Sequence, residues 1–132
     1  MENKLLPKEL RIGNLVKLML NHEDYEILSV KIEDLAWIEK LQGEYEPILL
    51  TEEWLTRFGF VRINHQMSLN DGSMTYHYEL NGDNRFWQLY FNGRAFSINE
   101  PKFRHHLYHN QYVHQLQNLY FALTGEELTI KN

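Results

Sequence analysis

The stretch VHQLQNLYFALTGEEL, residues 113–128, decides how the second half of the chain is organised. At about 100° per residue its apolar side chains fall on one arc, a pattern typical of a helix that faces a core. We expect Asn110 to be the N-cap, Gly125 to end the helix, and residues 128–130 to return as a short strand. The predicted core positions are Tyr112, Val113, Leu116, Leu119, Tyr120 and Leu123.

A second stripe on this helix does not belong to that arc. Phe121 lies on the flank with His114, Gln117 and Asn118, at spacings that place side chains beside one another on a helix. This flank contacts either a partner subunit or another part of the chain, and the sequence leaves both interpretations open. The glutamates at 126–127 lie beyond the helix, so they share no helical face with the histidine and indicate no catalytic site.

The segment before the helix predicts an antiparallel meander. Its strand candidates are FVRIN, MTYHYEL, RFWQLYF and RAFSI, and the pair Asn92-Gly93 between the last two is a strong hairpin signal. The third candidate is apolar on both faces, whereas a half-solvated strand alternates apolar and polar residues. We therefore expect the C-terminal helix to cover one face, and the first half of the chain, a second copy or a ligand to cover the other.

Aromatic residues of this meander form a candidate binding site. Aromatic faces together with guanidinium groups suit a base or a nucleotide, because bases stack on rings and arginine binds phosphate. The alternative is that these rings are ordinary cross-strand pairs and core. The aromatic positions are Tyr76, Tyr78, Trp87, Tyr90 and Phe96, and the predicted ligand-binding residues are Tyr90, Arg94, Arg85 and His77.

The first half reads as short strands followed by a helix. Strands are expected at 15–19, 25–32, 35–41 and 47–50, a pattern that resembles the small barrels of Tudor and KOW domains. In TEEWLTRFGF, residues 51–60, Thr51 is a good N-cap and Gly59 a good terminator. The predicted fold is thus α+β. A small antiparallel barrel-like unit spans 1–50, and 51–132 hold the short helix, the meander and the C-terminal helix, sharing one core with the first part.

Composition limits the classes of function. The net charge of −5, with 7 Lys or Arg against 12 Asp or Glu in residues 1–59, argues against binding along a nucleic-acid backbone. The chain has no cysteine and no apolar run near the roughly 20 residues of a membrane helix, which favours the bacterial cytoplasm and no membrane partner. The histidines of RHHLYH, residues 104–109, provide two metal ligands at most from one strand, so we predict a polar edge strand and neither metal nor cofactor.

Three segments carry a family resemblance. ELRIGNLV near the start, LLTEEWLTRFGF in the middle and YVHQLQNLYFALTGEEL at the end resemble a group of short uncharacterised proteins encoded by prophages and mobile elements of gut anaerobic bacteria. The resemblance implies a small accessory protein that acts against host defence or regulation by binding.

Together these observations predict a non-enzymatic binding protein that forms a homo-oligomer. It would sequester a nucleotide-like ligand or block a host protein. A nucleic-acid adaptor that uses the barrel-like half is the first alternative, and a small enzyme is the second.

Overall fold

The computed structural model describes residues 5–68, 74–80, 88–98 and 110–131, which form two compact units. The first unit comprises Met1–Leu49 and Tyr112–Glu127, and the second comprises Leu50–Gln111 and Leu128–Asn132. The fold is mixed α+β with two antiparallel sheets, as predicted. In this division the C-terminal helix belongs with the first unit.

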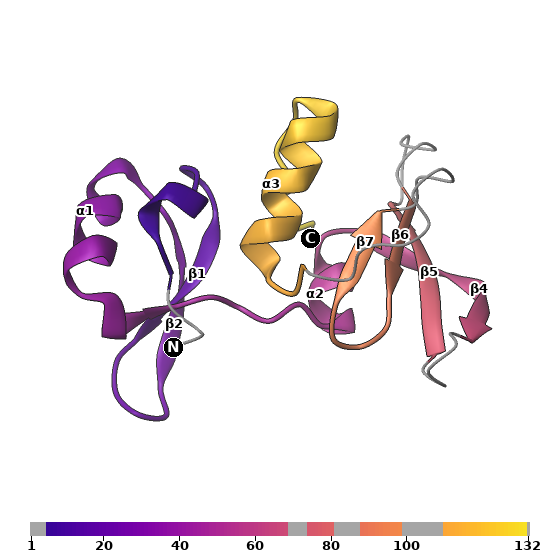
Figure 1. Ribbon diagram of the computed structural model, residues 1–132, viewed down its shortest axis with the longest axis horizontal. Helices are drawn as coiled ribbons and strands as arrows, with labels where there is room; N and C mark the ends of the chain where they lie inside the picture. The colour runs from indigo at the N-terminus through magenta and orange to yellow at the C-terminus, as the bar shows by residue number, and fades with distance from the viewer. Residues whose placement is uncertain (1–4, 69–73, 81–87, 99–109, 132) are drawn as a thin grey trace. The chain divides into compact units, whose positions relative to one another are not determined.

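The first unit is built around a three-stranded sheet in the order β2-β1-β3 (Figure 1). Strands β1 (Leu15–Met19) and β2 (Tyr25–Ser29) form a hairpin, and the short β3 (Tyr45–Glu46) pairs with the other side of β1. The predicted strands at 15–19 and 25–32 are therefore confirmed, the second ending at Ser29. Single turns of 3-10 helix, η1 (Pro7–Glu9) and η2 (Gln42–Glu44), flank these strands. Buried side chains of its core are Leu5, Leu10, Val16, Val30, Ile38 and Tyr45.

Two predicted strands of the first half are wrong. Residues 35–40 lie in helix α1 (Ile32–Lys40), and Leu41 is its C-cap. Asp34 fixes the start of the helix, since its carboxylate accepts the backbone N–H of Lys31 at 2.8 Å. Helical spacing lets Ile38 alone of this helix reach full burial. Residues 47–50 form no strand, only a single bridge between Leu49 and Tyr112. The described residues form no closed barrel.

Helix α3 (Val113–Thr124) is held against the loop before β1 by the amide of Gln117. Its Oε1 accepts the backbone N–H of Leu15 at 2.8 Å, and its Nε2 donates to the carbonyl of Gly13 at 3.2 Å. The side chain is only 3% exposed. The single amide of Gln117 thus provides hydrogen-bond partners for two backbone groups that are removed from water and would otherwise be unpaired.

Asn118 extends this contact by one residue. Its Nδ2 donates to the carbonyl of Glu9 at 2.9 Å, and its Oδ1 accepts from the buried Asn14 at 2.9 Å and from Arg11 at 3.1 Å. The Arg11 guanidinium also lies 4.0 Å from the ring centroid of Phe121 and pairs with a carboxylate oxygen of Glu127. The flank of α3 that holds Asn118 and Phe121 therefore contacts another part of the same chain, which is one of the two alternatives left open by the sequence.

These polar contacts rotate the buried face of α3 away from the predicted arc. Val113, Leu116 and Tyr120 are buried as expected, but Leu123 is 58% exposed. The predicted helix end is confirmed, since Gly125 adopts φ +76° and its N–H bonds to the Phe121 carbonyl. The predicted N-cap is wrong. Tyr112 takes that position and donates its N–H to Gln115 Oε1 at 3.0 Å. Residues 128–130 form no strand.

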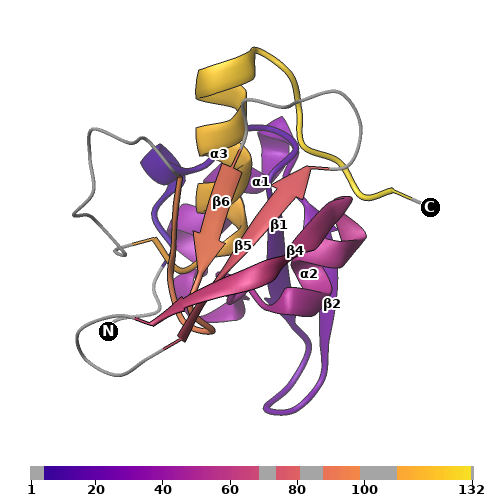
Figure 2. The same cartoon turned by 90° about the vertical axis from the view of Figure 1, so that its right-hand side faces the viewer.

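The second unit contains the predicted meander as a four-stranded sheet in the order β4-β5-β6-β7 (Figure 2). The strands are β4 (Phe60–Ser68), β5 (Met74–Leu80), β6 (Gln88–Phe91) and β7 (Phe96–Ile98). All pairs are antiparallel, so the predicted strands are confirmed, with β4 reaching four residues beyond FVRIN and β7 beginning at Phe96. Residues 85–87 of RFWQLYF lie outside the described residues.

The helix predicted at 51–60 is also confirmed. Helix α2 (Glu52–Arg57) begins where Thr51 Oγ1 accepts the Trp54 N–H at 3.3 Å, and Gly59 follows it at φ +100°. Trp54, Leu55 and Phe58 are buried, and the helix packs against β4. The unit therefore covers one face of its sheet with a helix of its own.

The contact made by Gln117 gives the first testable prediction. Gln117→Leu should lower the free energy of unfolding by about 2–4 kcal/mol, because it leaves a buried N–H and a buried carbonyl without partners. Leu123→Ala, on the exposed side of the same helix, should change it by no more than about 0.5 kcal/mol. Urea unfolding of both variants measures the difference, and equal effects would contradict the role given to the amide.

Candidate functional site

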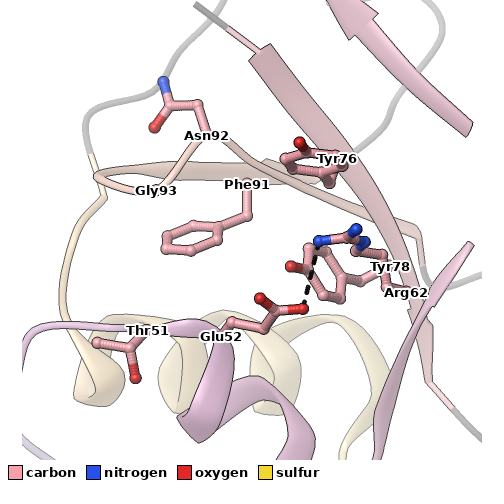
Figure 3. A pocket seen from close by; sticks show the side chains of 8 residues that line it. All are labelled: Thr51, Glu52, Arg62, Tyr76, Tyr78, Phe91, Asn92 and Gly93. Carbon is pink, nitrogen blue, oxygen red and sulfur yellow. Dashed lines mark ion pairs between the residues drawn. The ribbon is translucent and has the colours of Figure 1, made fainter.

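A pocket of about 240 Å³ lies in the second unit, between the first turn of α2 and one face of the sheet (Figure 3). The antiparallel register explains its composition. Arg62 of β4 pairs with Tyr78 of β5, and Tyr76 of β5 pairs with Phe91 of β6, so all four side chains emerge on one face. The lining residues are Thr51, Glu52, Arg62, Tyr76, Tyr78, Phe91, Asn92 and Gly93.

The apolar part of the pocket is rigid because it belongs to the core. Tyr78 and Phe91 are 2% and 4% exposed, and their rings meet edge-to-face with centroids 6.4 Å apart. Figure 3 shows the Phe91 and Tyr76 rings near the paired charged groups of Glu52 and Arg62. Core packing therefore fixes the Tyr78 and Phe91 rings, and they expose little of their own surface to the pocket.

The polar part of the pocket is one ion pair. Arg62 Nη1 lies 3.5 Å from Glu52 Oε2, and the Arg62 guanidinium lies 4.2 Å from the centroid of the Tyr76 ring. Both charged side chains are about half exposed, so the pair itself adds at most about 1 kcal/mol to stability. The ion pair instead helps to fix the position of the Arg62 guanidinium, which the ring of Tyr76 and the carboxylate of Glu52 both restrict.

Tyr78 contributes a neutral hydroxyl to the same place. Burial raises the pKa of this phenol above its usual value, and the nearby carboxylate of Glu52 raises the pKa further, while Arg62 opposes the shift. The phenol therefore keeps its proton at neutral pH. The pocket offers a carboxylate that accepts hydrogen bonds and a guanidinium that donates them, and the Tyr78 hydroxyl bonds to these same two groups.

The hairpin between β6 and β7 forms one wall of the pocket. The predicted hairpin is confirmed, but its loop is longer than the pair Asn92-Gly93, since Phe91 pairs with Phe96 and four residues connect them. Asn92 Oδ1 accepts the backbone N–H groups of Arg94 and Ala95, both at 2.9 Å, and Gly93 takes φ +92°. The side chain of Asn92, itself part of the lining, therefore fixes this turn.

The residues predicted to bind a ligand lie elsewhere. His77 and Tyr90 are neighbours, with ring centroids 5.0 Å apart, but they emerge on the face opposite Tyr76 and Phe91. His77 is buried, and its Nε2 lies 3.8 Å from a carboxylate oxygen of Glu79. Arg94 is exposed in the hairpin loop. Arg85 and Trp87 lie outside the described residues, so that group as a ligand site stays a prediction.

Sequence reasoning missed Glu52, Arg62 and Phe91 as site residues. Arg62 carries the available signal, because it is a charged residue on the strand face that the buried Phe60, two residues earlier, also occupies. Its partners follow only from the register of β4 against β5 and from the angle of α2, and neither quantity is encoded locally.

The residues predicted as a partner interface are mostly internal to the first unit. His114 and Gln117 are buried at 2% and 3% exposure, Asn118 is half-buried, and Phe121 is exposed beneath Arg11. The ring of His114 stacks on Tyr112 with centroids 5.9 Å apart, and its Nδ1 has no hydrogen-bond partner among the described residues. Burial lowers the pKa of His114 to about 4, so the ring is neutral at pH 7.

No protein-family model, curated protein or solved structure matches the chain. Within the ranges that the structure describes, no three His, Cys, Asp or Glu side chains converge as metal ligands. The histidines of 104–109 lie outside those ranges. None of the described helices has the length and apolar character needed to cross a bilayer.

The burial of His114 predicts a pH dependence of stability. The pKa in the folded state, about 4, is below the unfolded value of 6.5, so the unfolded state takes up the proton first as pH falls. The contribution of the neutral ring is complete above about pH 6.5 and is lost towards pH 4, with a slope of up to about 1.4 kcal/mol per pH unit.

His114→Phe keeps a stacked ring and removes this titration. Urea unfolding of both proteins at several pH values between 7 and 5 should show that the wild type loses stability faster than the variant on acidification. A constant difference between the two across that range would contradict the assignment. An NMR titration of the wild-type ring gives a second measure that does not depend on the variant folding.

Proposed function

We propose that the second unit is a non-enzymatic binding module for a small planar heterocycle of the nucleobase type. The observation that carries the proposal is the arrangement of aromatic rings around a paired carboxylate and guanidinium in one pocket. Rings bind a flat ligand by stacking, and the two charged groups provide the directional hydrogen bonds that would orient it.

The size of the pocket limits which ligands can fit. Pockets for drug-sized ligands span about 300–1,000 Å³, and this pocket is slightly smaller. A single base or a comparable ring system suits such a volume better than an entire nucleotide. Any sugar or phosphate attached to the base would extend into solvent past the exposed Gly93.

The charge of the pocket limits the class of ligand further. Glu52 and Arg62 neutralise each other, so the lining has no excess positive charge with which to attract a polyphosphate. A carboxylate beside a guanidinium instead matches a neutral edge that presents N–H donors next to a carbonyl acceptor. Several nucleobases and related heterocycles have such an edge.

The wider role proposed from the family resemblance is sequestration. A mobile element gains from a small protein that holds a nucleotide-like signal in the cytoplasm of its host, and such a role requires binding without turnover. Blocking of a host protein remains the alternative within the same class. A nucleic-acid adaptor is the weaker proposal, because the first unit contains 12 Asp or Glu against 6 Lys or Arg.

Calorimetry against a panel of free nucleobases, nucleosides and nucleotides tests this proposal. We expect bases and nucleosides to bind, with added phosphates giving no gain in affinity. Tyr76→Ala should weaken binding about tenfold to a hundredfold, since stacking contributes about 1–3 kcal/mol per base. Arg62→Gln should weaken it as well, with the fold retained because the side chain is half exposed.

Arg94→Gln is the matched control. It removes the same charge from an exposed arginine of the hairpin loop, and binding should be unchanged. If Arg94→Gln weakens binding while Arg62→Gln does not, the site is the group predicted from the sequence. If no member of the panel binds and native mass spectrometry of protein purified from cells finds no retained small molecule, the proposal fails.

A further inference from the structure

Strand β2 forms an edge of the first unit's sheet. The sheet order is β2-β1-β3, and no described strand lies beyond β2. Two of its apolar side chains are open to solvent, with Tyr25 47% and Ile27 41% exposed. Figures 1 and 2 both show the tip of the β1–β2 hairpin projecting. Every residue of β2 except the half-buried Leu28 is exposed.

The backbone of β2 has hydrogen-bonding groups directed outward. At one end the carbonyl of Asp24 accepts from Leu20, and at the other the N–H of Val30 donates to Asn14, so these two residues face inward. Because strand residues alternate, the N–H and C=O groups of Tyr25, Ile27 and Ser29 point away from β1. These three residues form the outer edge of β2.

The edge is held in shape before any partner arrives. In the hairpin tip, Asn21 Oδ1 accepts the backbone N–H groups of Glu23 and Asp24, both at 2.8 Å. The tip therefore fixes the start of β2, and pairing with another strand would cost little ordering entropy. Natural edge strands are usually protected by lysine, proline or a bulge, yet the outer edge of β2 contains none of these.

We propose that β2 pairs antiparallel with β2 of a second copy of the chain, about a two-fold axis at Ile27. This inference concerns the first unit and does not rest on the ligand proposed for the second. In this register Ile27 faces its own copy and Tyr25 faces Ser29, so every residue of the outer edge has a hydrogen-bonded partner. The contact is isologous, as closed dimers require.

Neighbouring registers satisfy fewer backbone groups. An axis at Glu26 would pair Glu23 with Ser29, but the N–H of Glu23 already bonds to Asn21. It would also place Glu26 opposite its own copy, where like charges repel. An axis at Leu28 would pair Tyr25 with Lys31, whose N–H already bonds to Asp34. Among the described residues, the axis at Ile27 uses only backbone groups that bond to no other group.

Charge complementarity supports the same register. With the axis at Ile27, Glu23 of one copy lies opposite Lys31 of the other, and the two-fold symmetry repeats this pair at the far end. Both side chains are exposed in the single chain. The charges that flank the edge thus attract each other in this register. This attraction favours the register over its neighbours, which the apolar residues alone would not do.

A single cysteine tests the geometry, because the chain contains no other. Hydrogen-bonded partners in an antiparallel pair have Cα atoms about 5.5 Å apart, within the range of a disulfide. Ile27→Cys should therefore form a covalent dimer on mild oxidation. Tyr25→Cys, on the same face, should not, because its copies would lie about 13 Å apart. The double variant with Tyr25→Cys and Ser29→Cys should cross-link again.

Sedimentation over a concentration series tests the association itself. The wild type should dimerise, and Ile27→Lys should be monomeric with an unchanged circular dichroism spectrum, since it places two positive charges on the axis. Leu123→Lys makes the same kind of change at an exposed leucine of α3 and should leave the dimer intact.

Charge exchange tests the register independently. Lys31→Glu should weaken the dimer about three- to tenfold, and adding Glu23→Lys to it should restore the affinity. A wild type that stays monomeric, a dimer that survives Ile27→Lys, or cross-linking of Ile27→Cys no faster than of Tyr25→Cys would each overturn the proposal.

Discussion

Two adjacent amide side chains determine how the first unit closes. Gln117 and Asn118 bind the backbone of residues 9–15, and this contact decides which face of α3 is buried. Apolar burial alone would favour the arc that contains Leu123. The amide contacts are directional, so an unmade bond at a buried backbone group would cost more than the exposure of one leucine. The helix is thus oriented by its polar residues, and its apolar residues fill the space that remains.

The structural features that could be predicted from the sequence are those that depend on a few neighbouring residues. The cap at Thr51, the glycine stops at Gly59 and Gly125, and the β6–β7 hairpin were predictable because each depends on a few consecutive residues. The prediction of a strand at 35–41 is wrong, although the acids at 33–34 are a local helix-start signal. The sequence contains no comparable local signal for the partner of α3, since Gln117 and Gly13 are distant along the chain and their contact is tertiary.

Prediction of the candidate site from the sequence is limited in the same way, because its residues come together through tertiary structure. Its aromatic residues were predictable as a class, because Tyr76 and Tyr78 alternate along a strand. Which face they share with a charged residue depends on the alignment of β4 with β5, and a shift by one residue would exchange the two faces. The sequence therefore indicated an aromatic sheet but assigned the binding role to Tyr90 and His77, which emerge on the other side.

The discontinuous first unit also has a consequence for synthesis of the protein. Its sheet leaves the ribosome early, whereas α3 follows only after most of the second unit has been translated. During this interval Asn14 and the carbonyl of Gly13 lack the amides that later bind them. Completion of the first unit must wait for a late helix, and this separation adds distant contacts that slow folding. A ribosome stalled before residue 113 would therefore hold a nascent hairpin that is open to chaperones.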